Sequence, residues 1–177
     1  MCLLRLRWDQ EVPDEIQKKW EAWQASLRKA PSITTPRCVF KSHWTHFEIH
    51  GFADASKVAV CASLYIILYQ DLRSVYQNLL VANSRVAPKG TSILRLELVA
   101  VHTLTKLENS VSEALTFFPI STYHNGIDSV MLLCWLANRE EWSTFLHNRV
   151  KKIGELTDAV WSYVPTKENP SASGLEG

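Results

Sequence analysis

The stretch FEIHGFADASKVAVCASLYIILY, residues 47–69, decides the fold of this chain. Its first part, 47–53, alternates roughly between apolar and polar residues, and residues 54–56 form a turn signal. The second part, 57–69, is rich in β-branched and aromatic residues, which suit a buried strand. Its longest apolar run is far below the ~20 residues that a membrane span needs. We therefore expect two paired strands here and no membrane-spanning segment.

The pattern downstream of this stretch predicts a third strand and then a mixture of helices and strands. Three consecutive strands with short turns favour an antiparallel meander. The expected order, βββαβααβ, favours an α/β domain in which parallel strands extend the sheet and helices flank it. We expect strands at 74–84, 118–127 and 161–164, and helices at 92–107, 128–137 and 142–159.

The N-terminal part of the chain has a different pattern. Residues 14–29 follow Pro13 and place Trp20 and Trp23 on one apolar helical face, so they predict an amphipathic helix. Residues 29–36 contain two prolines and predict a linker. We place a domain boundary near residue 38 and expect the two tryptophans to hold the helix on the main domain rather than to stack on nucleobases.

The composition excludes several classes of protein. In 177 residues, 46% are hydrophobic and 21% are charged, which excludes a disordered chain. A net charge of +1 excludes a strongly basic protein that coats nucleic acid. No glycine-rich phosphate-binding motif occurs. The four cysteines are widely spaced and form no zinc-binding pattern, so we expect free thiols in a reducing compartment.

Three acidic residues stand at unusual positions. Asp54 ends an apolar strand, and Asp128 follows another and precedes a helix; alone, each has a local alternative as a turn former or an N-cap. Glu97 lies within the apolar stripe of the helix at 92–107, where a lone carboxylate costs several kcal/mol of desolvation. We expect the three to converge, raise one another's pKa, and suit a hard cation such as Mg²⁺ or Mn²⁺. Two such ions can activate a water and stabilise the leaving oxygen of a phosphodiester.

Longer strings make a more specific pattern. They are GFADASKVAVCASLY (51–65), NSRVAPKGTSILRLELVAV (83–101), IDSVMLLCWL (127–136), FLHNRVKKI (145–153) and VPTKENP (164–170). In this order they resemble the BEL/Pao retrotransposon polyprotein, in the ribonuclease-H-like region that is often labelled Pao retrotransposon peptidase. The upstream stretch resembles the segment that joins the polymerase to that region, so the resemblance covers nearly the whole chain.

The resemblance implies a ribonuclease-H-like domain at 38–177, with a helical connector at 1–37 that follows a reverse-transcriptase-like region of the same polyprotein. It also implies metal-dependent hydrolysis of the RNA strand of RNA–DNA hybrids, with Mg²⁺ or Mn²⁺ held by Asp54, Glu97 and Asp128. It implies no small-molecule cofactor and no membrane. We expect an intracellular, cytoplasmic location in a retroelement particle. An aspartic peptidase is not supported, because the Asp-Thr/Ser-Gly loop that holds its carboxylate pair is missing.

The tail departs from the family pattern. Ala172 stands where the family has the fourth acid of its metal site, which predicts a weakened two-metal site. The family's closing helix is also missing, so we expect the domain at 38–177 to be C-terminally truncated. Glu176, one helical turn further on, is an alternative source of the missing charge. The three intact acids favour an enzyme with reduced or lost activity, whereas Ala172 favours an inactive retrotransposon remnant that at most binds nucleic acid.

Basic side chains flank the predicted acidic site. They are either an ordinary solvated surface or contacts to the phosphates of a hybrid, which salt would weaken. A nearby histidine, His124, is either a proton shuttle or, more simply, a loop residue. The candidate nucleic-acid-binding residues are Arg85, Lys89, Arg95, Arg149, Lys151 and Lys152.

Overall fold

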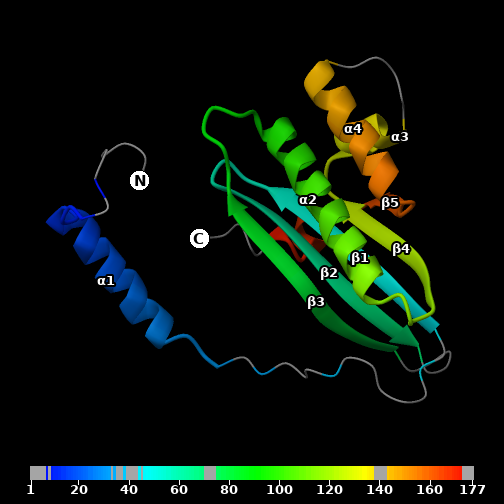
Figure 1. Cartoon of the computed structure of the whole chain (residues 1–177), viewed down its shortest axis with the longest axis horizontal. Coiled ribbons are helices and arrows are strands. Elements are labelled where there is room, and N and C mark those ends of the chain that lie inside the picture. The colour runs from blue at the N-terminus through cyan, green and yellow to red at the C-terminus, as the bar shows by residue number, and fades with distance from the viewer. Residues whose placement is uncertain are drawn as a thin grey trace. The chain divides into compact units, whose positions relative to one another are not determined.

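The computed structural model describes residues 7, 9–32, 34, 38, 44, 46–69, 75–137 and 143–172. The chain divides into two compact units, Met1–Cys38 and Val39–Gly177 (Figure 1). In its described residues the first unit contains one helix, α1 (Asp14–Arg28), none of whose residues is buried. The rings of Trp20 and Trp23 stack on each other, with their centroids 4.8 Å apart. The expected docking of this helix through the two tryptophans stays a prediction.

The second unit is a mixed sheet with flanking helices. Its elements follow the predicted order βββαβααβ, and a short 3₁₀ helix, η1 (Thr166–Glu168), comes after them. No helix in the described part of the chain is both long and apolar enough to cross a membrane. The elements are β1 (His46–Ala55), β2 (Ala59–Tyr69), β3 (Val75–Val86), α2 (Ile93–Ala114), β4 (Ile120–Ile127), α3 (Val130–Ala137), α4 (Thr144–Leu156) and β5 (Val160–Tyr163).

The sheet has five strands in the order β3-β2-β1-β4-β5, so β1 lies at its centre. β1 pairs with β2 in antiparallel fashion, and β2 pairs with β3 in the same way. On its other side β1 runs parallel to β4, which runs parallel to β5. The carboxyl ends of β1 and β4 therefore reach the same edge of the sheet.

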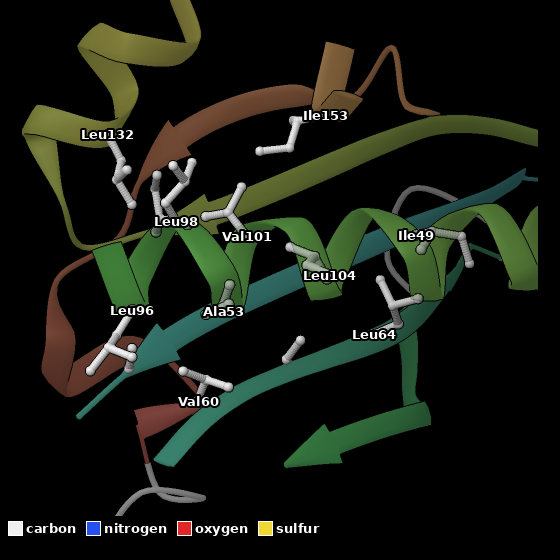
Figure 2. Close-up of a cluster of buried hydrophobic side chains, with 14 of the residues drawn as sticks. Ile49, Ala53, Val60, Leu64, Leu96, Leu98, Val101, Leu104, Leu132 and Ile153 are labelled. Atoms are coloured by element: carbon white, nitrogen blue, oxygen red, sulfur yellow. The ribbon is translucent and has the colours of Figure 1, made fainter. Parts of the chain in front are cut away.

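The hydrophobic core lies between α2 and the sheet. Figure 2 shows Leu98, Val101 and Leu104 of α2 beside side chains from β1 and β2, among them Ile49 and Leu64. All five are at most 1% exposed, and burying each side chain contributes roughly 1.5–3 kcal/mol to folding. The helix is thereby held over the centre of the sheet, with its N-terminal turn at the edge where β1 ends.

Several boundaries differ from the sequence prediction by two residues or more, and three of these differences have a local reason. α2 runs seven residues past 107, because Leu107 and Val111 continue its apolar side and pack against the core. β2 begins at Ala59 rather than 57, because the turn occupies those positions. α4 ends at Leu156, because Thr157 has extended backbone dihedral angles. The predicted start of that last helix, 142, lies outside the described residues.

Gly51 is the point where β1, β4 and α2 approach most closely. A Cβ atom on Gly51 would lie 2.3 Å from Oδ1 of Asn125 and 2.9 Å from Cδ1 of Leu104. Asn125 and Leu104 are both 0% exposed, so neither side chain can withdraw into solvent. Only a glycine fits at this position, because any side chain would separate the strand from its neighbour or from the helix.

We expect Gly51→Ala to lower the free energy of unfolding by about 1–3 kcal/mol, because overpacking a filled core forces its neighbours to shift. Gly154→Ala in α4 is the matched control, because a Cβ atom there meets nothing within 4 Å. That change should raise the stability by about 0.5–1 kcal/mol through helix propensity. Denaturant unfolding of both variants measures the difference, and equal effects would contradict the close approach at Gly51.

Candidate active site

Three acidic side chains meet at the edge where β1 and β4 end. Asp54 is the second-last residue of β1 and is 8% exposed. Asp128 comes directly after β4, and Glu97 lies in the second turn of α2; both are half-buried. Together they line one small pocket with Ala53, Val101, Ile127, Ser129 and Leu132. The structure thus brings together the three acids that the sequence singled out.

Serine residues fill the two local roles, turn former and N-cap, that the sequence allowed for Asp54 and Asp128. At the turn after β1, the Ser56 hydroxyl accepts hydrogen bonds from the N–H groups of Val58 and Ala59, at 3.2 and 3.1 Å. At the start of α3, the Ser129 hydroxyl accepts one from the N–H of Leu132 at 3.4 Å. The helix begins at Val130 and not at the acid itself. Neither aspartate is therefore explained as a turn former or an N-cap.

The electrostatics of the pocket disfavour ionisation. Burial raises the pKa of Asp54, and the nearby charge of Asp128 raises it further. Burial also raises the pKa of Glu97; a hydrogen bond with Ser129 opposes this shift, and the charges of both aspartates add to it. No ion pair among the described residues involves any of the three acids. The pKa values of Asp54 and Glu97 are thus raised, as expected, but burial contributes more to these shifts than the repulsion between the acids does.

The donor set fits a hard divalent cation. All three side chains offer carboxylate oxygens, and Oε2 of Glu97 is buried without a hydrogen-bond partner. One oxygen of Asp54 accepts the N–H of Ala55 at 2.7 Å, and Oδ2 of Asp128 accepts the Thr166 hydroxyl at 2.6 Å. These bonds orient the two aspartates, and the unpartnered Glu97 oxygen leaves a lone pair that a cation could accept.

The tail lies alongside the end of β1. The Asn169 side chain donates to the carbonyl of Ala53 at 3.0 Å, and the Ser171 hydroxyl donates to the carbonyl of Phe52 at 2.9 Å. Asn169 and Ser171 are 3% and 1% exposed, so this segment is built into the domain. Ala172 comes next, and its N–H donates to the carbonyl of Asn169 at 3.1 Å. Glu176 lies outside the described residues.

Some of the predicted basic residues gather between α2 and α4. The guanidinium groups of Arg95 and Arg149 both lie over the ring of Phe145, at 5.1 and 3.9 Å from its centroid. Burial lowers the pKa of His102, and the charges of Lys106, Arg149 and Lys152 lower it further. We call Arg95, Lys106, Arg149 and Lys152 the basic seam. Sequence reasoning missed Lys106, although it lies 11 residues after Arg95 and so three helical turns along one face.

The remaining basic residues lie elsewhere. Arg85 is exposed near the end of β3, opposite Val60, and Lys89 is exposed in the loop before α2. Lys151 lies 3.9 Å from Glu155 on α4, in an exposed pair. The sequence prediction placed three of the six residues beside the Glu97 helix and three on a later helix. The structure instead groups Arg95 of α2 with Arg149 and Lys152 of α4.

His124 is not a loop residue. It lies within β4, and its ring centroid is 4.9 Å from that of His50 on β1. A cavity of about 510 Å³ opens between α4 and β5, and none of the three acids lines it. We place the candidate active site by the convergence of charge and not by cavity size.

A comparison with protein families gives one match. The family described as Pao retrotransposon-like RNaseH-like domain matches residues 1–129. The matched range includes all three acids and ends before the tail. No curated protein matches the chain.

The solved structures that are similar to this chain include cellular and viral proteins. Ribonuclease H1 from the archaeon Halobacterium salinarum is 16% identical, with a TM-score of 0.47 over 72% of this chain and 93% of its own. LC11-RNase H1 from compost, solved with an RNA/DNA hybrid, is 15% identical, with a TM-score of 0.48 over 73% and 92%. The foamy viral protease–reverse transcriptase, solved with double-stranded DNA, is 15% identical, with a TM-score of 0.48 over 88% of this chain and 29% of its own.

We expect Glu97→Gln to raise the thermal midpoint of the metal-free protein at neutral pH. Because folding raises the pKa of Glu97, the folded state holds the proton more tightly, and stability falls as the pH rises through the interval above the ordinary value of 4.5. Removing the charge removes this loss, so the difference from wild type should shrink as the pH falls below 4.5. Thermal unfolding in a chelator across this pH range measures it.

Glu113→Gln is the control, because Glu113 is exposed on the same helix and its main contact is a hydrogen bond from Asn109. It should leave the midpoint nearly unchanged at every pH. A midpoint for Glu97→Gln at or below that of wild type at neutral pH would show that repulsion and burial do not act on this carboxylate.

Proposed function

Because the chain belongs to the Pao retrotransposon-like RNaseH-like domain family, we propose that it hydrolyses the RNA strand of RNA–DNA hybrids with bound divalent metal ions. The chain is a retroelement domain with a ribonuclease-H-like fold, in which a mixed five-stranded sheet carries flanking helices. The finer statement, that it cleaves hybrids with Mg²⁺ or Mn²⁺, is the proposal.

One observation supports the proposal above the others. Asp54, Glu97 and Asp128 come from three separate elements, yet they line a single pocket in which no described cation pairs with them. Keeping three carboxylates together without a counter-charge destabilises a protein, because each raises the cost of ionising the others. A site that binds divalent cations supplies that counter-charge.

In the proposed reaction these three residues would hold the metal. A bound divalent ion would supply an activated water and stabilise the leaving oxygen of the phosphodiester. The contribution of the chain is to hold the carboxylates ready, through the N–H of Ala55 on Asp54 and the hydroxyl of Thr166 on Asp128. The half-buried position of Glu97 keeps its carboxylate at the pocket instead of in solvent.

The basic seam would bind the phosphates of the hybrid. Its four cations lie near Phe145 and His102, and Lys106 and Lys152 are exposed. Lys and Arg on one face supply the sequence-independent, salt-sensitive part of nucleic-acid binding. Arg85 and Lys89 lie outside the basic seam, so they would contact the strands of the hybrid as a separate patch.

The second candidate function is an inactive domain that binds nucleic acid without cleaving it. Ala172 favours this candidate, because it stands where the resemblance implies a fourth acid. Three acids would hold a second cation weakly. We also propose that residues 1–37 form a connector after a reverse-transcriptase-like region, in a retroelement particle.

We expect the wild-type chain to cleave hybrids slowly or not at all, and Ala172→Asp to raise the rate at least tenfold, about 1.4 kcal/mol of barrier. The added carboxylate would hold the second cation more tightly, so the gain should be largest at low metal concentration. Residual wild-type activity should prefer Mn²⁺ over Mg²⁺, because Mn²⁺ binds these ligands more tightly. Metal-titrated cleavage of a labelled RNA–DNA hybrid measures the rates.

Two variants control this test. Asn has nearly the shape of Asp without its charge, so Ala172→Asn should give no gain in rate. Asp54→Asn should abolish any activity. If Ala172→Asp folds and is as inert as Asp54→Asn, the missing acid is not the main defect, and the inactive candidate is favoured.

We expect Lys152→Ala to weaken binding of an RNA–DNA hybrid in a chelator and to lower the slope of log affinity against log salt by about one. Lys152 belongs to the basic seam and is exposed, so its loss should not disturb the fold. Lys18→Ala on α1 is the control of equal charge and should leave the slope nearly unchanged. Equal effects of both changes would remove the seam as the binding surface.

A further inference from the structure

A second group of metal-ligand side chains lies away from the acidic pocket. Glu48 and His50 of β1 and His124 of β4 each offer one ligand atom, and these atoms all lie within 4.8 Å of one another. In the described part of the chain this is the one set of three His, Cys, Asp or Glu residues that meets that distance. The three acids of the candidate active site are therefore more widely spaced than this group.

The pairing of β1 with β4 creates the group. His50 is paired directly with His124 across the parallel ladder, and Glu48 lies two residues earlier on β1. Side chains alternate along a strand, so Glu48 and His50 share one face of the sheet. Phe47 and Ile49, the residues between and before them, are buried in the core under α2. The group therefore lies on the opposite face from that helix.

Two of the three side chains, Glu48 and His50, are already held in place by hydrogen bonds. Oε2 of Glu48 lies 3.1 Å from Nε2 of His50 and accepts the Tyr69 hydroxyl at 3.0 Å. Oε1 of Glu48 lies 3.1 Å from Nε2 of His46, which is itself 3.1 Å from the Ser121 hydroxyl. The Glu48 and His50 side chains are 18% and 31% exposed, so the group is partly shielded but reachable from solvent.

Two imidazoles and one carboxylate are a donor set that suits Zn²⁺ and related transition metals better than Mg²⁺. Ligand atoms around a tetrahedral zinc ion lie about 3.4 Å apart, given bonds of about 2.0–2.1 Å. The 3.1 Å between Oε2 of Glu48 and Nε2 of His50 already matches this spacing. The ligand atom of His124 lies within 4.8 Å of the other two, so it would have to move only a short way toward them. Tyr69 is placed to orient the carboxylate from outside, as supporting hydrogen bonds do in metal sites.

We propose that Glu48, His50 and His124 form a binding site for a divalent transition-metal cation of the zinc class, separate from the acidic pocket. Three protein ligands leave the fourth position of a tetrahedral ion for water. The site would connect β1 and β4 on the face of the sheet that α2 does not cover. It goes beyond the proposed hydrolysis, because none of its residues belongs to the acidic pocket or to the basic seam.

The test is a zinc titration of the full chain, stripped of metal, against a chromophoric chelator and with Mg²⁺ in excess to occupy the acidic pocket. We expect one zinc ion to bind, and His124→Gln to weaken its binding at least about tenfold, since even residues behind the ligands contribute that much. His147→Gln on α4 is the matched control, because His147 is exposed and outside the group. Zinc should also raise the thermal midpoint of wild type and of the control but not of His124→Gln.

Two further variants keep the test decisive. If His124→Gln does not fold, Glu48→Gln removes one ligand charge with almost no change of shape and should give the same loss. Asp54→Asn should bind zinc like wild type. Zinc binding that survives both His124→Gln and Glu48→Gln, or that is lost in Asp54→Asn alone, would place the ion elsewhere and overturn the proposal.

Discussion

The parallel pairing of β1 with β4 is the constraint on which the rest of the structure depends. It requires Gly51, because no Cβ atom fits between the strand, Asn125 and Leu104. It brings the ends of both strands to one edge, which places Asp54 and Asp128 in one pocket. Both proposed metal sites take residues from this ladder: Asp54 and Asp128 at its edge, and Glu48, His50 and His124 on the face that α2 does not cover.

The direction of α2 links the two parts of the proposed enzyme. Arg95 and Glu97 are two residues apart, which puts them on nearly opposite sides of a helix. Burial of Leu98 and Val101 against the sheet turns Glu97 toward the acidic pocket and leaves Arg95 over the ring of Phe145 on α4. The packing of α2 on the sheet therefore positions both the proposed metal ligand Glu97 and Arg95 of the basic seam.

The acidic pocket is a source of instability that the fold tolerates. Burial and like charges raise the pKa of Asp54 and of Glu97, and no cation among the described residues forms an ion pair with either carboxylate. The compensation comes from the core, where large aliphatic side chains fill the space between α2 and the sheet. The tail adds two buried hydrogen bonds to β1 beside the pocket, so the segment that ends at Ala172 belongs to the same local structure.

The sequence by itself determined the elements, their order and the three acids. Alternation, turn signals and helical spacing are local properties, so the strand at 47–53 and the helix at 92–107 were predictable, and Glu97 was conspicuous as a charge within an apolar stripe. The tertiary structure alone decided which side chains lie together. The register that sets His50 against His124, and the meeting of Asp54, Glu97 and Asp128 in one pocket, depend on strand pairing and side-chain direction. Those arise from contacts between residues far apart in the chain, which no local pattern encodes.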